Sequence, residues 1–311
     1  MGRRPFRFGV QVSAAVDAKA WSDQARAAED LGYATLWMPD HLGEQWAPLV
    51  GLTAAATATT SIRIGALVFD NDYRHPGLLA REMATLDVVS DGRLELGMGA
   101  GWLRSDYEQF GLPYDPPGRR VDRLEEGVRV VKALWGGDPV WFDGSHYRLQ
   151  GARCLPRTVQ RPHPPVLVAG GGRRVLGVAA READIVGFNA SLAAGEIGPE
   201  AARSALAERF RERVAWVREA AGDRFDQLEL QCNTAFCLVG VDPRAAAAVM
   251  APGFGITPEE ALEVPIVLAG SVDEICHTLE RRRQELGFSY WSVPGEALHA
   301  FAPVVDRLTG R

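Results

Sequence analysis

The stretch LELGMGAGW, residues 94–102, decides the fold class, because it joins a buried strand to a run of small residues. Leu94 to Gly97 are typical of a strand, and Gly99, Ala100 and Gly101 come next. Glycine and other small residues follow a strand where a ligand or another backbone segment lies close to it. That neighbour could be a dinucleotide phosphate on a Rossmann fold, or a different ligand on a different fold.

A Rossmann fold is the poorer match to this stretch. Its fingerprint G-x-G-x-x-G needs a third glycine where this chain has Trp102. The stretch is also the fourth apolar run of the chain, whereas the opening strand of a dinucleotide-binding unit carries the phosphate loop. No acidic residue ends a following strand roughly 20 positions on, where it would bind a ribose. These departures favour a different fold.

Outward from this stretch, one junction recurs: an amphipathic helix ends, turns briefly and enters an apolar strand. It is clearest in EDLGYATLWMP (29–39), READIVGF (181–188) and QELGFSYWSVP (284–294). Such junctions build parallel sheets, because a parallel strand needs a helical crossover. The pattern predicts eight strands, near 6–12, 34–38, 62–69, 93–97, 165–169, 184–188, 230–239 and 288–293. Helices are predicted over 18–31, 47–59, 76–90, 119–135, 173–182, 200–221, 272–286 and 296–308.

Parallel strands that alternate with helices in this number predict an α/β fold, the (β/α)8 TIM barrel. Residues 136–164 and 240–270 are too long for plain crossovers, so they are predicted to be insertions after barrel strands that shape the mouth of the site. The first includes PVWFDGSHYRL, which alternates around Asp143-Gly144 like a small hairpin. No stretch has the character of a linker, so residues 1–311 are expected to form a single barrel domain.

The composition is that of an ordinary globular protein, with 47% apolar and 24% charged residues. A net charge of −6 provides no basic field, so no nucleic-acid partner is expected. The N-terminus lacks an apolar signal region and no apolar run approaches about 18 residues. No membrane contact is therefore expected, and the expected location is the cytoplasm.

The cysteines and histidines give no metal motif. Cys232 and Cys237 fall in one apparent strand, five residues apart, so their side chains should point to opposite faces and cannot pair. The six histidines are scattered without the spacing of a metal-binding motif. No metal site is expected.

In a TIM barrel the chemistry sits where the strands end. The second predicted strand ends at Asp40 and His41, and the third ends at Asp70. The fifth ends at Gly170, Gly171, Gly172 and Arg173. These residues open a helix, so free N–H groups and the positive helix end would face an anion, although the glycines could also serve only a tight turn. Two glycine-lined strand ends on one rim suit a broad, flat ligand with a phosphate group.

The order PDHL (39–42), RHPGLLAREMATLDVVSDGRLELGMGAGW (74–102) and VLVAGGG (166–172) resembles the bacterial luciferase-like monooxygenase superfamily. Within it, the chain resembles the coenzyme F420-dependent oxidoreductases more than the FMN monooxygenases. The resemblance implies a luciferase-like TIM barrel, usually a homodimer, that transfers a hydride between F420 and a small organic substrate. The alternative that it leaves open is an FMN-dependent two-component monooxygenase, which would need a separate reductase as a partner.

The resemblance also implies site residues. It implies a cis peptide bond between Leu67 and Val68 that bulges the third strand against the cofactor ring, with Asp70 facing the cofactor. The remaining cofactor contacts that it implies are Gly99, Ala100 and Gly101 beside the ring, and Gly170, Gly171, Gly172 and Arg173 at the phosphate. His41, preceded by Asp40, matches the position near the reactive face, where an imidazole can exchange a proton near neutral pH. Arginines 104, 173 and 174 are expected close to the acidic tail of F420.

Other interpretations stay open. A cofactor-free barrel hydrolase or aldolase is disfavoured because the strand ends offer neither a lysine nor a set of metal ligands. A non-enzymatic flavin-binding protein would bind the cofactor without turnover. At single positions, His41 could merely cap its loop and Asp40 could only hold the loop through backbone hydrogen bonds. His75 is expected to serve the start of the helix that follows it.

Overall fold

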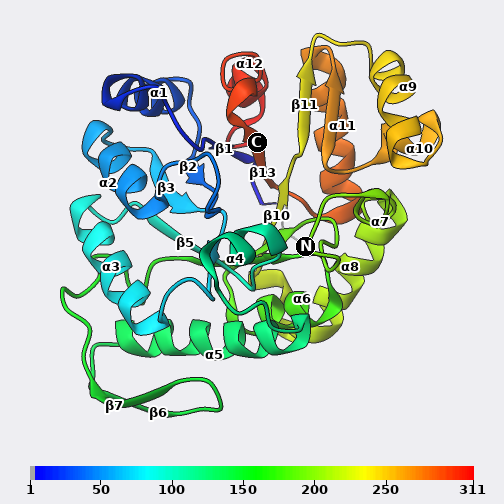
Figure 1. Cartoon of the computed structure of the whole chain (residues 1–311). Helices are drawn as coiled ribbons and strands as arrows, with labels where there is room; N and C mark the ends of the chain where they lie inside the picture. The colour runs from blue at the N-terminus through cyan, green and yellow to red at the C-terminus, as the bar shows by residue number, and fades with distance from the viewer. Residues whose placement is uncertain (1–3) are drawn as a thin grey trace.

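Parallel strands surrounded by helices form a closed barrel in the computed structural model, which describes residues 4–311 (Figure 1). Neighbouring strands follow the order β3-β2-β1-β13-β10-β9-β8-β5, and pairing of β3 with β5 closes the ring. The eight barrel strands of this described part are β1 (Arg7–Gln11), β2 (Thr35–Met38), β3 (Arg63–Ala66), β5 (Leu94–Gly99), β8 (Val166–Gly170), β9 (Ile185–Phe188), β10 (Glu229–Asn233) and β13 (Tyr290–Pro294). The predicted TIM barrel is confirmed.

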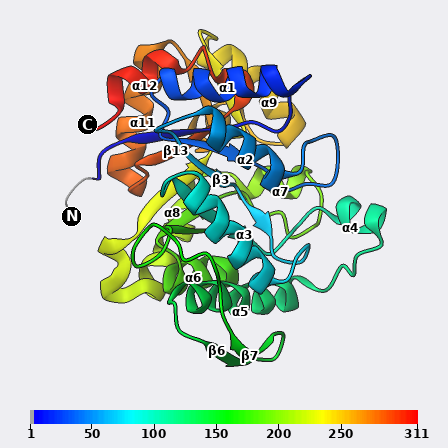
Figure 2. The same ribbon diagram turned by 90° about the vertical axis from the view of Figure 1, so that its left-hand side faces the viewer.

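The helices that cover the barrel lie outside the ring of strands in both views (Figures 1 and 2). They are α1 (Ala18–Asp30), α2 (Pro48–Ala58), α3 (Pro76–Val89), α5 (Pro117–Trp135), α6 (Arg173–Glu182), α8 (Ala207–Ala221), α11 (Val272–Leu286) and α12 (Ala302–Leu308). Local sequence fixes several of their ends. Ser271 and Glu274 form a capping box at the start of α11, and Gly287 ends that helix in the left-handed conformation. His75 accepts a hydrogen bond from the Gly77 N–H at 3.1 Å, which confirms its expected role at the start of α3.

The remaining elements lie in loops between the barrel units. They are β4 (Phe69–Asp70), α4 (Arg104–Phe110), β6 (Val140–Asp143), β7 (Arg148–Ala152), α7 (Pro199–Ser204), η1 (Gly222–Gln227), β11 (Phe236–Val239), α9 (Pro243–Phe254), α10 (Pro258–Glu263), β12 (Val267–Gly270) and η2 (Gly295–Ala297). The antiparallel pair β6–β7 confirms the predicted hairpin. No helix in residues 4–311 is long and apolar enough to cross a bilayer.

The single strand predicted over 230–239 is wrong. Its first part, β10, belongs to the barrel, and its second part, β11, leaves the barrel and pairs with β12. The break falls at Thr234, whose N–H and Oγ1 both donate to the Ser292 carbonyl oxygen, at 2.9 and 2.7 Å. Cys232 and Cys237 therefore lie in different sheets, and both are free thiols.

The single helix predicted over 200–221 is also wrong, because α7 ends at Ser204 and α8 begins at Ala207. The buried Arg213 guanidinium donates to the Ser204 carbonyl oxygen at 2.6 Å and to the Gly171 carbonyl oxygen at 2.8 Å. The Ser204 carbonyl oxygen therefore has a hydrogen-bond partner although the helix does not continue past it. The last predicted helix, over 296–308, begins only at Ala302, and the short helix α4 was not predicted.

The glycines of residues 94–102 permit close contact with the neighbouring segment of the third barrel unit. Cβ atoms at positions 97, 99 and 101 would lie 2.1 Å from the Ala66 carbonyl oxygen, 2.4 Å from Val68 Cγ2 and 2.3 Å from Asp70 Oδ2. The close neighbour that requires these glycines is therefore another segment of the same chain, residues 66–70. β3 pairs with the first half of β5 and β4 with its second half, so the chain bends between them at residues 67 and 68.

The N-terminal end of the barrel is closed by a buried polar cluster. The Glu95 carboxylate is 1% exposed and accepts from the Arg7 guanidinium at 2.5 Å and from the Tyr290 hydroxyl at 3.1 Å. Arg7 also pairs with Glu229 at 2.6 Å, and its guanidinium lies 3.6 Å from the centre of the Tyr290 ring. Burial and the Glu95 charge raise the pKa of Tyr290 well above its usual value. These side chains fill one end of the barrel and leave the opposite end for a ligand site.

Candidate active site and cofactor cavity

The predicted site residues gather at the carboxyl ends of the barrel strands. Asp40 and His41 follow β2, and Asp70 ends β4. Gly170 ends β8, directly before α6. The helix α4 stands above this end of the barrel, in front of the strands in Figure 1 and at the right in Figure 2. Because α4 follows β5, the loops after β2, β4, β5 and β8 surround one region.

A cavity of about 340 Å³ opens between the loops that follow β5, β8 and β9; it is called the cofactor cavity below, after the ligand that the sequence predicts for its residues. The predicted residues that line it are Ala100, Gly101, Gly170, Gly171, Gly172 and Arg173. Gly172 is the N-cap of α6, and no side chain of residues 4–311 caps that helix. A Cβ at Gly172 would meet no atom within 4 Å, whereas a Cβ at Gly171 would lie 2.3 Å from the Ala190 carbonyl oxygen. Uncapped N–H groups beside open space suit a phosphate.

The peptide bond between Leu67 and Val68 is cis, as the resemblance implied. The Leu67 carbonyl oxygen accepts from Gln11 Nε2 at 3.3 Å, and Leu67 is 7% exposed. Val68 and Asp70 lie beside Gly99, Leu67 packs with Leu167 and Ala169 of β8, and none of the three lines the cofactor cavity. These residues thus form a second part of the predicted cofactor site, nearer the barrel axis.

Asp70 sits in a buried hydrogen-bond cluster. Its Oδ2 accepts from the Tyr107 hydroxyl at 2.9 Å, and its Oδ1 accepts from the Asp72 N–H at 2.8 Å. Burial, together with the nearby charges of Asp72 and Asp40, raises the pKa of Asp70 to about 7. The Tyr107 hydroxyl oxygen also lies 3.0 Å from Asp72 Oδ2, so its single proton is shared between the two carboxyl groups, and Asp72 pairs with Arg123 at 2.7 Å. A carboxyl group with such a pKa can hold or release a proton near neutral pH.

Asp40 is 5% exposed, and both of its carboxylate oxygens have partners. Oδ2 accepts from the Asp70 N–H at 3.0 Å and from Arg74 at 2.6 Å, while Oδ1 accepts from Arg74 at 3.2 Å. These contacts tie the ends of the second and third barrel units together. The arrangement favours a role for Asp40 in positioning Asp70 and the adjacent His41.

The His41 side chain is 33% exposed, so a ligand can reach it. Its Nδ1 lies 2.7 Å from Asp106 Oδ2, which also accepts from the Tyr73 hydroxyl at 3.3 Å. A carboxylate can only accept, so Nδ1 donates, and Nε2 is left for a ligand. The His41 ring packs edge-on against Trp102, with 5.5 Å between ring centres. The contact with Asp106 fixes the orientation and tautomer of the imidazole.

Sequence reasoning missed several of the side chains that build this region. Asp106 and Tyr107 lie on α4, which was not predicted, and their hydrogen-bond partners in this region lie 33 to 65 positions earlier in the chain. Arg120 is 2% exposed on α5 and donates to the carbonyl oxygens of Gly101 at 2.5 Å and Ala100 at 3.3 Å. A helical arginine usually indicates a solvated face, so the sequence held no signal for this contact.

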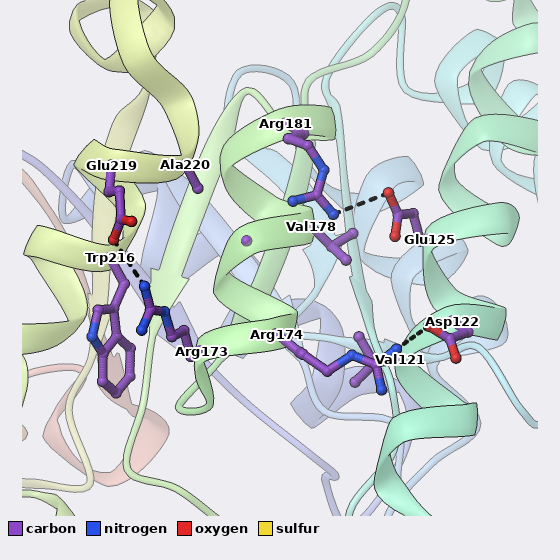
Figure 3. A pocket seen from close by; sticks show the side chains of 11 residues that line it. Val121, Asp122, Glu125, Arg173, Arg174, Val178, Arg181, Trp216, Glu219 and Ala220 are labelled. Atoms are coloured by element: carbon purple, nitrogen blue, oxygen red, sulfur yellow. Dashed lines mark hydrogen bonds and ion pairs between the residues drawn. The ribbon is translucent and has the colours of Figure 1, made fainter.

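The arginines expected near an anionic tail already have partners. Arg173 and Arg174 line both the cofactor cavity and a second hollow outside the barrel, shown in Figure 3, where they pair with Glu219 and Asp122. The Arg104 guanidinium lies 4.8 Å from the centre of the Tyr114 ring. Exposed ion pairs contribute at most about 1 kcal/mol, so an anionic ligand can exchange with these acidic partners.

Comparisons with known proteins identify the family of this chain. A family model described as luciferase-like monooxygenase matches residues 4–270. An F420-dependent glucose-6-phosphate dehydrogenase of Nakamurella multipartita is 31% identical over 234 residues, which cover 72% of this chain and 66% of that protein. An FMNH(2)-dependent dimethylsulfone monooxygenase of Pseudomonas putida is 30% identical over 42% of this chain and 36% of its own length.

A solved structure shares the fold. The coenzyme F420-dependent tetrahydromethanopterin reductase of Methanopyrus kandleri aligns with a TM-score of 0.79 and 20% identity, over 98% of this chain and 100% of its own. This likeness supports the barrel alone. The chain spans at most about two thirds of the length of these curated relatives.

Proposed function

This chain belongs to the luciferase-like monooxygenase family, and we propose that it is an oxidoreductase that exchanges a hydride between coenzyme F420 and a small organic substrate. The glycine-lined cofactor cavity at the start of α6 carries the proposal, because it offers uncapped N–H groups for a phosphate next to Ala100 and Gly101, which follow β5. The relative from Nakamurella multipartita, named as F420-dependent, supports F420 over FMN.

The residues at hand fit such a cofactor. Gly170, Gly171 and Gly172, with the first turn of α6 at Arg173, would hold its phosphate. The segment Gly99–Gly101 and the bend at Leu67 and Val68 would flank its ring, with Asp70 beside them. When bound, F420 supplies two-electron hydride chemistry, and the protein supplies placement and proton handling.

His41 is the residue that we assign to proton handling. Its Nδ1 donates to Asp106 at 2.7 Å, so Nε2 can accept a proton from a substrate hydroxyl or, once protonated, return one. Asp40 acts indirectly, because its contacts with Arg74 and the Asp70 N–H hold the loop that carries His41.

An FMN-dependent monooxygenase with a separate reductase is the second candidate, and the dimethylsulfone monooxygenase relative favours it. Without oxygen, the purified protein should change the absorbance of F420 when alcohols, aldehydes or enones are supplied. Oxygen uptake with reduced FMN, together with no turnover of F420, would instead establish the second candidate. A cytoplasmic homodimer also belongs to the proposal, and light scattering of the purified protein tests the dimer.

A further inference from the structure

Two buried arginines lie behind the glycine loops of the cofactor cavity. Arg213 of α8 is 3% exposed, and its guanidinium donates to the Gly171 carbonyl oxygen at 2.8 Å. Arg120 of α5 is 2% exposed and donates to the Gly101 carbonyl oxygen at 2.5 Å. Within the described part of the chain, no carboxylate pairs with either guanidinium. Two buried positive charges without a paired carboxylate therefore flank one cavity.

Arg213 fixes the direction of the peptide unit between Gly171 and Gly172. This peptide bond is trans, so its carbonyl and its N–H point in opposite directions. Arg213 holds the carbonyl oxygen from outside the cavity, because both glycines line the cavity and Arg213 does not. The Gly172 N–H therefore points away from Arg213, toward the open space at the start of α6.

The same arginine also fastens a neighbouring loop of the cavity. It donates to the Ser204 carbonyl oxygen at 2.6 Å, and Ser204 Oγ accepts from the Ser191 N–H at 2.7 Å. Ser191 lines the cavity, and a Cβ at Gly171 would lie 2.6 Å from the Ser191 nitrogen. The start of α8, which packs beside α6 (Figure 1), thus holds two loops of the cavity in contact with each other.

The charge of Arg213 is unfavourable in these surroundings. Burial lowers the pKa of Arg213 to about 10, an effect that Glu212 opposes and Arg209 reinforces. The guanidinium still carries its charge at neutral pH. Buried charges are normally paired, and an anion in the cofactor cavity would supply a counter-charge on the far side of the Gly171–Gly172 peptide.

We propose that Arg213 is a positioning residue that selects phosphate-bearing ligands for the cofactor cavity. It does so by turning the Gly172 N–H toward the phosphate and by holding a positive charge behind the loop. The inference rests on the proposed function, because it assumes that the phosphate of the cofactor lies at the start of α6. Arg213 does not touch the ligand. Its effect should therefore appear with phosphate-bearing ligands and not with the same ring systems without phosphate.

The test measures, by calorimetry, the affinity of the full-length protein for F420, FMN, riboflavin and the deazaflavin of F420 without its phosphate and tail. FMN and riboflavin differ only in the phosphate, so the ratio of their affinities isolates its contribution. Arg213→Met keeps an unbranched side chain but removes the charge and the donors. It should weaken F420 and FMN about 10- to 100-fold, the scale of a hydrogen bond to a charged group, and leave the two phosphate-free ligands within about threefold.

Arg282→Met is the matched control. Arg282 of α11 is 2% exposed and donates to the carbonyl oxygens of Val264, Pro265 and Val267 at 3.0, 3.0 and 2.9 Å, and none of these residues lines the cofactor cavity. The variant should lower the melting temperature, because these carbonyl groups lose their partner, yet keep the ratio of FMN to riboflavin affinity within about twofold. Arg213→Lys retains the charge but not the fork of donors, so it should weaken FMN only about three- to tenfold.

An equal loss of affinity for FMN and riboflavin in Arg213→Met, an unchanged ratio in both Arg213 variants, or the same change of ratio in Arg282→Met would overturn the inference. If Arg213→Met does not fold, the ratio in Arg213→Lys decides, and its melting temperature verifies the fold. Absence of F420 binding, together with the expected loss of FMN affinity, would refute the proposed function and keep the role of Arg213. Absence of binding of both F420 and FMN to the unaltered protein would refute both.

Discussion

Gly101 is the residue where the fold and the proposed cofactor site constrain each other most tightly. Its φ is +68°, and an added Cβ would lie 1.9 Å from the Tyr107 hydroxyl and 2.3 Å from Asp70 Oδ2. Its carbonyl oxygen accepts from Arg120, and the residue lines the cofactor cavity. Gly101→Ala should therefore destabilise the protein and weaken cofactor binding together.

The expected cost has two parts. A non-glycine residue at this positive φ costs about 1–2 kcal/mol. The methyl group must also displace Tyr107 from Asp70, which removes a buried hydrogen bond to a carboxylate worth about 1.5–3 kcal/mol. The sum is about 2.5–5 kcal/mol, or a loss of roughly 4–8 °C in melting temperature for a protein of 311 residues.

Gly111→Ala is the matched control, because Gly111 has the same φ of +68° with no atom within 4 Å of the added Cβ. It should lose only the backbone part, roughly 1.5–3 °C, and should keep its cofactor affinity. Thermal unfolding at about pH 8 and calorimetric titration with F420 measure both effects. Equal losses of melting temperature in the two variants would refute the idea that the Tyr107–Asp70 contact depends on Gly101.

Three further predictions concern proton handling, pH and the phosphate. His41→Ala should cut turnover about 100-fold or more in steady-state assays, while F420 affinity changes little. Asp70 holds a proton up to about pH 7 in the folded protein, whereas the unfolded chain releases it near pH 4, so stability should fall as the pH rises between these values. Urea unfolding of Asp70→Asn should show a smaller fall over that window. Gly172→Asp should weaken F420 binding at least roughly tenfold without a change in melting temperature, because its Cβ enters open space.

A specific outcome would contradict each of these three predictions. Full turnover per bound cofactor in His41→Ala would make that residue a packing group. An equal loss of stability between about pH 4 and 7 in Asp70→Asn would assign the pH dependence to other groups. Gly198→Asp, at the N-cap of α7 and equally free of contacts, is the control for Gly172→Asp, and equal F420 affinity in both would locate the phosphate elsewhere.

The barrel was predictable because its signals are local. Each junction such as QELGFSYWSVP carries a helix end, a turn and an apolar strand within a dozen residues, and α6 and α11 have the predicted bounds. The two wrong elements break for reasons that lie far away in the sequence. Thr234 donates a hydrogen bond to Ser292, and Arg213 donates hydrogen bonds to Ser204 and Gly171. No local sequence pattern predicts either contact.

The same distinction applies to the candidate site. His41 and the Gly170–Gly172 run stand directly after strands, so their place on the rim follows from the topology. Asp106 reaches His41 across 65 positions, from a helix whose short sequence has no strong periodicity. This contact forms because the fold places α4 over the strand ends, and the sequence alone does not indicate that placement.

Parallel calorimetric titrations of the purified protein with F420 and with FMN test the central claim most directly. The account predicts binding of F420 at micromolar concentration or below, and weaker binding of FMN. Micromolar or tighter binding of FMN, with no detectable binding of F420, would contradict it.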